Sequence, residues 1–188
     1  MAAAPVRHYA KRATIFAAGE QGGALPKLLS GAVILYALLD DGRRQVLDLA
    51  GPGDLLHFET DGVVDHYAEA LTPCEVARFE AGDLLATGDG AAFLMEQMRD
   101  RLALERRHLT MLSRKGAAER LADFVRLAAD CLGQRDGRFE LPLTRQQIAD
   151  FTGLTLETVS RTFAQWEREA VLTRLAGRTY QMSEALAA

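Results

Sequence analysis

The sequence predicts an α+β protein that consists of a β-roll or jelly roll, one long helix and a winged helix-turn-helix. Three observations support this order. Short apolar runs alternate with Gly, Pro and Asp from residue 13 to residue 79, which is typical of antiparallel strands joined by turns. Residues 89–113 contain no proline, and no glycine after their opening turn, which predicts one long helix. Residues 142–170 contain two short amphipathic stretches joined at Gly153, and this pattern predicts a pair of packed helices.

The first 88 residues form the predicted β-roll. Asp41 and Gly42 separate the apolar runs AVILYALL and QVLDL, and glycine supplies the positive φ angle that a tight hairpin requires. A meander of several short strands closes as an antiparallel sandwich or jelly roll. We therefore expect domain boundaries at 1–88 for the roll, 89–113 for the long helix and 114–188 for the C-terminal domain.

The predicted long helix carries an apolar stripe. Its members recur at alternating spacings of four and three residues, which is typical of a seam between two helices. The stripe could instead pack only on the β-roll, and the seam is favoured if the protein acts as a dimer. The stripe consists of Ala91, Met95, Met98, Leu102, Glu105, Leu109 and Leu112.

The first helix of the C-terminal pair is predicted from its two ends. Thr144 precedes Gln147 by three residues, which is the spacing of a capping box. Ile148 and Phe151 supply apolar contacts, and Gly153 permits the left-handed conformation that ends a helix.

The second helix is expected to begin after Thr155, a candidate N-cap. Val159, Phe163 and Trp166 follow at spacings of four and three residues, which places them on one side of the helix. These three side chains should therefore anchor the helix in the core.

Glu157, Ser160 and Arg161 lie together on the opposite side, near the N-terminal end of this helix. A recognition helix meets base edges in the major groove of DNA with that end. Arginine can donate two hydrogen bonds to guanine, glutamate can accept from cytosine, and serine can adapt to several base edges. The simpler interpretation is a solvated ion pair between Glu157 and Arg161, but the surrounding two-helix pattern favours DNA recognition.

The charge distribution also assigns DNA contact to the C-terminal part. Residues 1–113 hold 11 Lys and Arg against 16 Asp and Glu, a net of −5, whereas residues 114–188 hold 11 against 10, a net of +1. The ending VLTRLAGRTYQMSE predicts a β-wing that turns near Gly177, with Arg174 and Arg178 available to phosphates. The candidate DNA contacts beyond the three on the recognition helix are Thr144, Arg145, Thr155, Thr158 and Arg178.

The segment LTRQQIADFTGLTLETVSR resembles the Crp/Fnr family of bacterial transcription regulators. Within that family, the arrangement of Glu157, Ser160 and Arg161 is similar to the Fnr and FixK type. The cyclic-AMP receptor type has an arginine in place of Leu156 and a glycine in place of Ser160. The resemblance implies the palindrome TTGAT-N4-ATCAA. Leucine cannot donate a hydrogen bond to guanine, so the outer guanine of a TGTGA site would not be recognised.

The same resemblance implies a homodimer that joins through the long helix and a β-roll of the cyclic-nucleotide-binding type. It also implies an activator that recruits RNA polymerase to genes for low-oxygen respiration, denitrification or nitrogen fixation. Fnr-type regulators are similar to this chain in placing an acidic residue at Glu105, where it holds the dimer near its threshold. Residues 51–59, GPGDLLHFE, correspond to the effector pocket, whose candidate residues are Gly53, Asp54, His57 and His66.

The residues favour a FixK-like regulator that has no cofactor and is controlled through its abundance. A cyclic nucleotide needs an arginine for its phosphate, but the corresponding segment VVDHYAEA contains none, so cyclic AMP is not the expected effector. An Fe-S cluster needs about four thiolates, and the chain has only Cys74 and Cys131. A haem-based gas sensor of the same family is the alternative. Its candidate axial ligands are His8, His57, His66 and His108.

An alternative from another class is a ligand-binding regulatory subunit or a small metabolite enzyme. The chain contains no HExxH, GxSxG or GxxxxGK[ST] motif and no paired Cys/His metal spacing. We therefore expect neither an enzyme nor a metal site. No apolar run approaches the ~20 residues of a membrane helix and no secretion signal is recognisable, so a cytoplasmic location without membrane contact is expected.

Overall fold

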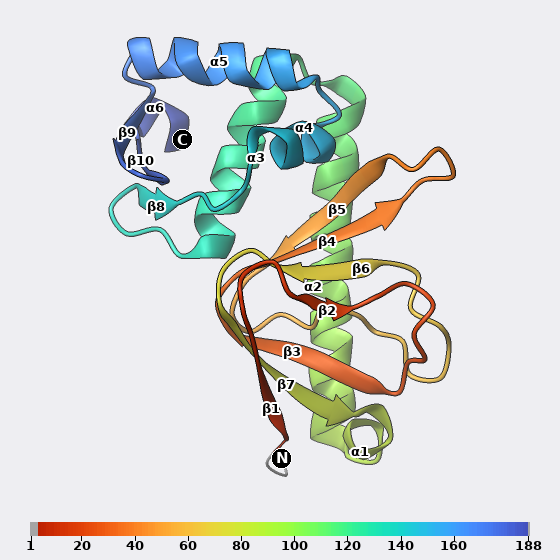
Figure 1. Ribbon diagram of the computed structural model, residues 1–188. Helices are drawn as coiled ribbons and strands as arrows, with labels where there is room; N and C mark the ends of the chain where they lie inside the picture. The colour runs from red at the N-terminus through yellow and green to blue at the C-terminus, as the bar shows by residue number, and fades with distance from the viewer. Residues whose placement is uncertain (1–3, 188) are drawn as a thin grey trace. The chain divides into compact units, whose positions relative to one another are not determined.

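The computed structural model describes residues 4–187. The chain forms two compact units, residues 1–107 and 108–188. The first unit contains two of the three sheets and most of the long helix, and the second contains the third sheet and several shorter helices (Figure 1).

The strands of the first unit form two antiparallel sheets, which confirms the predicted β-roll. Phe16 and Leu35 of one sheet share a buried core with Leu28 and Val76 of the other. One sheet has the order β1 (Val6–Tyr9), β7 (Cys74–Glu80), β3 (Ala24–Ser30), and the other has the order β2 (Thr14–Phe16), β6 (Tyr67–Ala70), β4 (Val33–Leu38), β5 (Arg44–Ala50).

The turn between β4 and β5 lies where the sequence predicts it. Gly42 has φ +80°, and its backbone N–H donates to Leu39 O at 2.8 Å. The Asp41 carboxylate accepts from Arg43 N at 3.0 Å. Glycine is favoured here because a side chain would resist this left-handed backbone.

Two helices follow β7: the short α1 (Ala81–Leu85) and the long α2 (Gly88–Arg114). The predicted long helix is therefore present, with one more residue at each end than expected. Leu94 of α2 packs in a cluster with Leu25, Leu55 and Leu84. A second connection is polar, because Arg101 of α2 forms an ion pair with the buried Asp48 of β5.

The second unit is a winged helix-turn-helix, as predicted. Its buried core includes Leu121, Phe124, Ile148 and Phe163. The helices are α3 (Ala117–Leu132), α4 (Arg145–Thr152), α5 (Leu156–Arg168) and α6 (Glu184–Ala187), and the sheet has the order β8 (Arg138–Glu140), β10 (Thr179–Met182), β9 (Leu172–Ala176).

The wing contains one element that the sequence did not predict. The strand β8 has only three residues, and its middle residue Phe139 pairs with Tyr180 of β10. A three-residue segment has too little alternation to be recognised without its partner. The turn at Gly177, between β9 and β10, was predicted, and its φ is +55°.

Within residues 4–187, none of the helices combines the length and the apolar character that spanning a membrane requires.

Candidate nucleic-acid interface

Helix α4 begins at the predicted capping box. Thr144 Oγ1 accepts from Gln147 N at 3.1 Å, and Gln147 Oε1 accepts from Thr144 N at 2.8 Å. At the other end Gly153 has φ +63°, and its backbone N–H donates to Ala149 O. Both ends of α4 are therefore determined by residues within the helix or next to it.

Two side chains from other helices bind the last carbonyls of α4. His108 of α2 donates from Nε2 to Phe151 O at 2.9 Å, and its ring stacks on Phe151 at 4.2 Å between centroids. Arg120 of α3 donates to Thr152 O at 3.3 Å. These donors satisfy carbonyls that have no partner within the helix, so the turn before the recognition helix is held by its own domain.

The structure places His108, one of the four candidate haem ligands, within the C-terminal unit. Its side chain is half-buried against Phe151 of α4, whereas the next residue, Leu109, is 67% exposed.

Helix α5 has the geometry of a recognition helix. Thr155 Oγ1 accepts from Thr158 N at 3.2 Å, which caps the helix. Val159, Phe163 and Trp166 are buried with exposed fractions of 0%, 1% and 8%, so this side of α5 is anchored in the core as predicted. The opposite side of its N-terminal half therefore faces outward.

The outward side carries the three predicted base-reading residues. Glu157, Ser160 and Arg161 are all exposed, and they lie within the first two turns of α5. Glu157 Oε1 and Arg161 Nη1 are 3.8 Å apart, with side-chain exposures of 86% and 68%. A solvated pair at this distance is weak, so both side chains are available to base edges.

Leu156 is a candidate contact that sequence reasoning treated only as a missing donor. It is the first residue of α5 and is 46% exposed. An exposed leucine next to an N-cap lies outside the buried stripe of the helix, which is the signal that could have identified it. Its side chain can contact the methyl group of a thymine.

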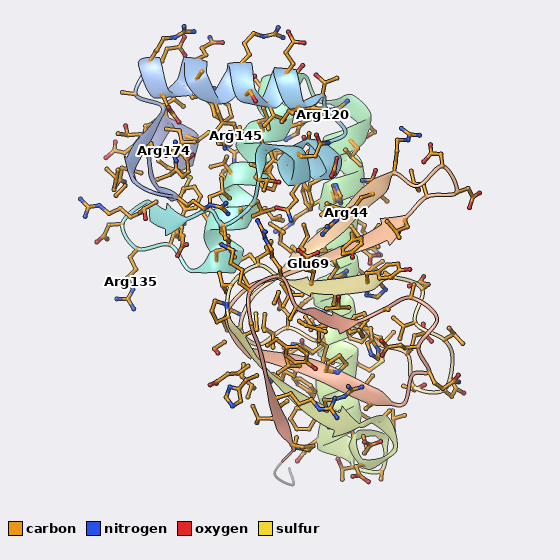
Figure 2. The ribbon with its side chains drawn as sticks, in the orientation of Figure 1. Arg44, Glu69, Arg120, Arg135, Arg145 and Arg174 are labelled. Carbon is orange, nitrogen blue, oxygen red and sulfur yellow. The ribbon has the colours of Figure 1, made fainter. Side chains whose placement is uncertain are left out.

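The flanking candidates differ in how accessible they are. The hydroxyls of Thr155 and Thr158 pair at 2.9 Å within the cap. Arg178 donates to Pro142 O, whereas Arg174 is exposed and donates to Gly177 O at 2.8 Å. Arg145 lies over the ring of Phe163, and Figure 2 labels it beside the recognition helix, with Arg174 on the wing.

The stripe on α2 is outward-facing. Met95, Met98, Leu102 and Leu109 have exposed fractions of 68%, 50%, 47% and 67%. Glu105 is also exposed, and Ala91 and Leu112 are half-buried. The roll packs instead on the face that contains Leu94, so it leaves the central part of the stripe uncovered.

The predicted effector residues of the roll contact other residues of the roll. The ring of Phe16 lies 4.9 Å from His57 and 5.4 Å from His66. Gly53 has φ +105° and lies in the turn closed by Asp54, whose carboxylate accepts from Gly51 N at 2.8 Å. Burial raises the pKa of the Asp54 carboxyl.

The two histidines of this region make hydrogen bonds within the roll. His66 Nδ1 is 2.8 Å from Asp65 Oδ1, and its Nε2 donates to Leu56 O at 3.1 Å. The buried His57 accepts from Glu59 N through Nδ1. Because both nitrogens of His66 are engaged, iron ligation there would require loss of an existing hydrogen bond.

His57 should make the stability of the roll depend on pH. Burial lowers its pKa from 6.5 to about 4, so the unfolded chain binds more protons between these values and stability falls as pH falls through them. We expect the free energy of unfolding at pH 5 to be about 2 kcal/mol below that at pH 7. Urea titrations followed by near-UV circular dichroism of the tyrosines would measure this.

The control for this prediction is a pair of histidine substitutions. His57→Gln should remove most of the difference between the two pH values. His8→Gln should retain it, because His8 is exposed. An equal pH dependence in the wild type and His57→Gln would refute the assignment.

A β-roll joined by a long helix to a winged helix-turn-helix with an exposed polar recognition face defines a DNA-binding regulator. Two family models match the chain: the cyclic nucleotide-binding domain over residues 6–88 and the Crp-like helix-turn-helix domain over residues 119–186. The chain belongs to the Crp/Fnr family of transcription regulators and is therefore not an enzyme.

Individual relatives agree with this assignment. The chain is 34% identical to the transcriptional activatory protein AadR of Rhodopseudomonas palustris over 87% of its own length and 72% of that protein. It is 35% identical to the nitrogen fixation regulation protein FixK of Rhizobium meliloti over 88% of its length and 76% of that protein. The structure of FixK2 from Bradyrhizobium japonicum is similar with a TM-score of 0.88 and 30% identity, covering 96% of this chain and 93% of that one.

Proposed function

We propose that this protein is a FixK-type activator that binds as a homodimer to a palindrome resembling TTGAT-N4-ATCAA. The observation that carries the proposal is the outward face of α5, where Glu157, Ser160 and Arg161 are exposed on a helix whose other side is buried. Arginine donates to guanine and glutamate accepts from cytosine, and both bases are present in each TTGAT half-site as a G·C pair.

The proposed regulator works in the cytoplasm, recruits RNA polymerase and acts on genes for nitrogen fixation or low-oxygen respiration. Support comes from two relatives, a transcriptional activatory protein and a nitrogen fixation regulation protein. No cofactor is required in this proposal, which fits a roll in which the ring of Phe16 contacts both His57 and His66. The amount of protein would then control activity.

A fluorescence-anisotropy titration at fixed salt tests the proposal. Cofactor-free protein purified in air is titrated against duplexes that carry TTGAT-N4-ATCAA or the corresponding TGTGA site. Tight binding that prefers the first duplex is expected. Equal affinity for both, or for an unrelated duplex, would contradict it.

The exposed stripe on α2 supports the homodimer. A two-fold symmetric site is matched by a two-fold symmetric protein, and the apolar residues at spacings of three and four suit the contact of two identical helices. Met95, Met98, Leu102 and Leu109 would be buried by the partner's copy of the same face.

Glu105 is expected to weaken this dimer. It lies between Leu102 and Leu109 on the stripe, so two copies would face each other across the two-fold axis. Arg101 Nε is 3.4 Å from Glu105 Oε1, but Arg101 also pairs with Asp48, so its charge is shared. Glu105→Ala should therefore lower the dimer dissociation constant by about a few fold. This corresponds to the small free energy that an exposed charge pair contributes.

Analytical ultracentrifugation of the wild type and Glu105→Ala measures the change. Glu96→Ala is a suitable control, because Glu96 is an exposed residue of α2 outside the stripe. An unchanged or weaker dimer in Glu105→Ala would show that Glu105 does not oppose association.

Leu156 is expected to contact the outer thymine of each half-site. This thymine takes the place of the outer guanine of a TGTGA site, and leucine can contact its methyl group. Replacing it with deoxyuridine removes only that methyl. Loss of ~0.8 kcal/mol per half-site should lower wild-type affinity by roughly tenfold for the two half-sites together.

The same anisotropy assay with uridine-containing duplexes tests this contact. Leu156→Ala should be nearly insensitive to the substitution. If deoxyuridine leaves wild-type affinity unchanged, Leu156 does not contact that methyl group.

A further inference from the structure

We infer that Arg145 is a positioning residue that holds the recognition helix against the first helix and the wing, and that it does not serve as a phosphate contact. This inference rests on the proposed function, because it concerns how selectively α5 recognises its site. It assigns to Arg145 a role different from the DNA contact expected from sequence.

The guanidinium of Arg145 meets two aromatic rings from two other elements. Its Cζ lies 3.6 Å from the ring centroid of Phe163 on α5 and 5.9 Å from that of Tyr180 on β10. Its Nη2 donates to Tyr180 Oη at 3.1 Å. Because Phe163 and Tyr180 are 1% and 4% exposed, the guanidinium covers one edge of the domain core.

The charge of Arg145 is partnered in an unusual way. It occupies the first position of α4, where the helix dipole disfavours a cation. Among the described residues no carboxylate pairs with it, so the faces of aromatic rings and a phenol oxygen stabilise the charge instead. A side chain that served only as a positive charge would not need to stack on a ring. The planar guanidinium of arginine is suited to such stacking, and the ammonium group of lysine is not.

The contact links the three elements whose relative positions determine DNA recognition. Phe163 follows Arg161 by two residues on α5, and its ring also lies 5.8 Å from Trp166 and 6.3 Å from Tyr180. Without Arg145, the contact between the start of α4 and Phe163 in the middle of α5 would be lost. The recognition helix would then have more rotational freedom, which lowers the difference in affinity between right and wrong bases.

The experiment compares three variants with wild-type protein. Arg145→Lys keeps the charge, Arg145→Ala removes it, and Tyr180→Phe keeps the ring but removes the hydrogen-bond acceptor. Anisotropy titrations give affinities for the TTGAT-N4-ATCAA duplex, its TGTGA counterpart and an unrelated duplex. The unrelated duplex is titrated at several salt concentrations, and urea unfolding followed by Trp166 fluorescence verifies that each variant is folded.

The positioning role predicts a loss of selectivity without a loss of salt dependence. The ratio of affinities for the two sites should fall on the order of tenfold in both Arg145 variants and a few fold in Tyr180→Phe. The salt slope on unrelated DNA should stay at the wild-type value in Arg145→Ala. Arg174→Ala, which removes the exposed arginine on the wing, provides the comparison for a lost phosphate contact, at about 0.9 of slope for each phosphate.

The opposite pattern would overturn the inference. In that case Arg145→Lys would keep the wild-type selectivity, and the salt slope of Arg145→Ala would fall as much as that of Arg174→Ala. Failure of the proposed function has a separate signature, because the wild type itself would then show no preference for TTGAT-N4-ATCAA.

Discussion

Replacing Arg161 by alanine should abolish selective binding of the TTGAT-N4-ATCAA duplex. Each bidentate contact between arginine and guanine contributes about 1–3 kcal/mol of discrimination, and a homodimer makes the contact twice. Affinity should therefore fall by at least about 30-fold. Because the Arg161 side chain is 68% exposed and its nearest partner is Glu157 at 3.8 Å, the fold should be unaffected.

The origin of this loss can be tested on the DNA as well as on the protein. Changing the guanine of both half-sites should weaken the wild type strongly but change Arg161→Ala little, because the partner residue is already absent. Arg168→Ala is the matched control, since Arg168 is exposed in the last turn of the same helix. An Arg161→Ala variant that retains wild-type selectivity would disprove the assigned role of this residue.

The second large effect is expected from Leu102→Glu. Leu102 is 47% exposed at the centre of the α2 stripe. In a dimer, the substitution would place two new carboxylates close to the two copies of Glu105, and burying unpaired like charges is strongly unfavourable. We expect the dimer dissociation constant to rise by more than about 100-fold, since two partly buried charges cost several kcal/mol.

Sedimentation analysis should then find a folded monomer, and affinity for the palindrome should fall because one subunit contacts one half-site. Leu85→Glu is the control: Leu85 is 54% exposed on α1 and is not part of the stripe, so its dimer should match the wild type. An unchanged dimer in Leu102→Glu would mean that the α2 stripe is not the interface.

Features that depend on neighbouring residues were predictable from the sequence. The capping box of Thr144 and Gln147, the left-handed Gly153 and the turn at Gly42 all involve atoms within a few residues of each other. The buried side of α5 follows from helical periodicity in the same way. The sequence alone therefore determined the β-roll, the long helix and the winged helix-turn-helix, together with the outward face of the recognition helix.

Contacts between distant residues were decided only by the tertiary structure. His108 and Phe151 are 43 positions apart, and Arg145 and Tyr180 are 35 apart. No periodicity or local motif encodes such pairs, because any exposed-looking polar residue could pack on a ring from another element. The fold thus placed His108 on the turn of α4, stacked Arg145 on the ring of Phe163, and selected the face of α2 that the roll covers. Each outcome has the same physical cause. Apolar and aromatic surfaces pack between elements that are far apart in the sequence, and the local sequence does not specify which elements come into contact.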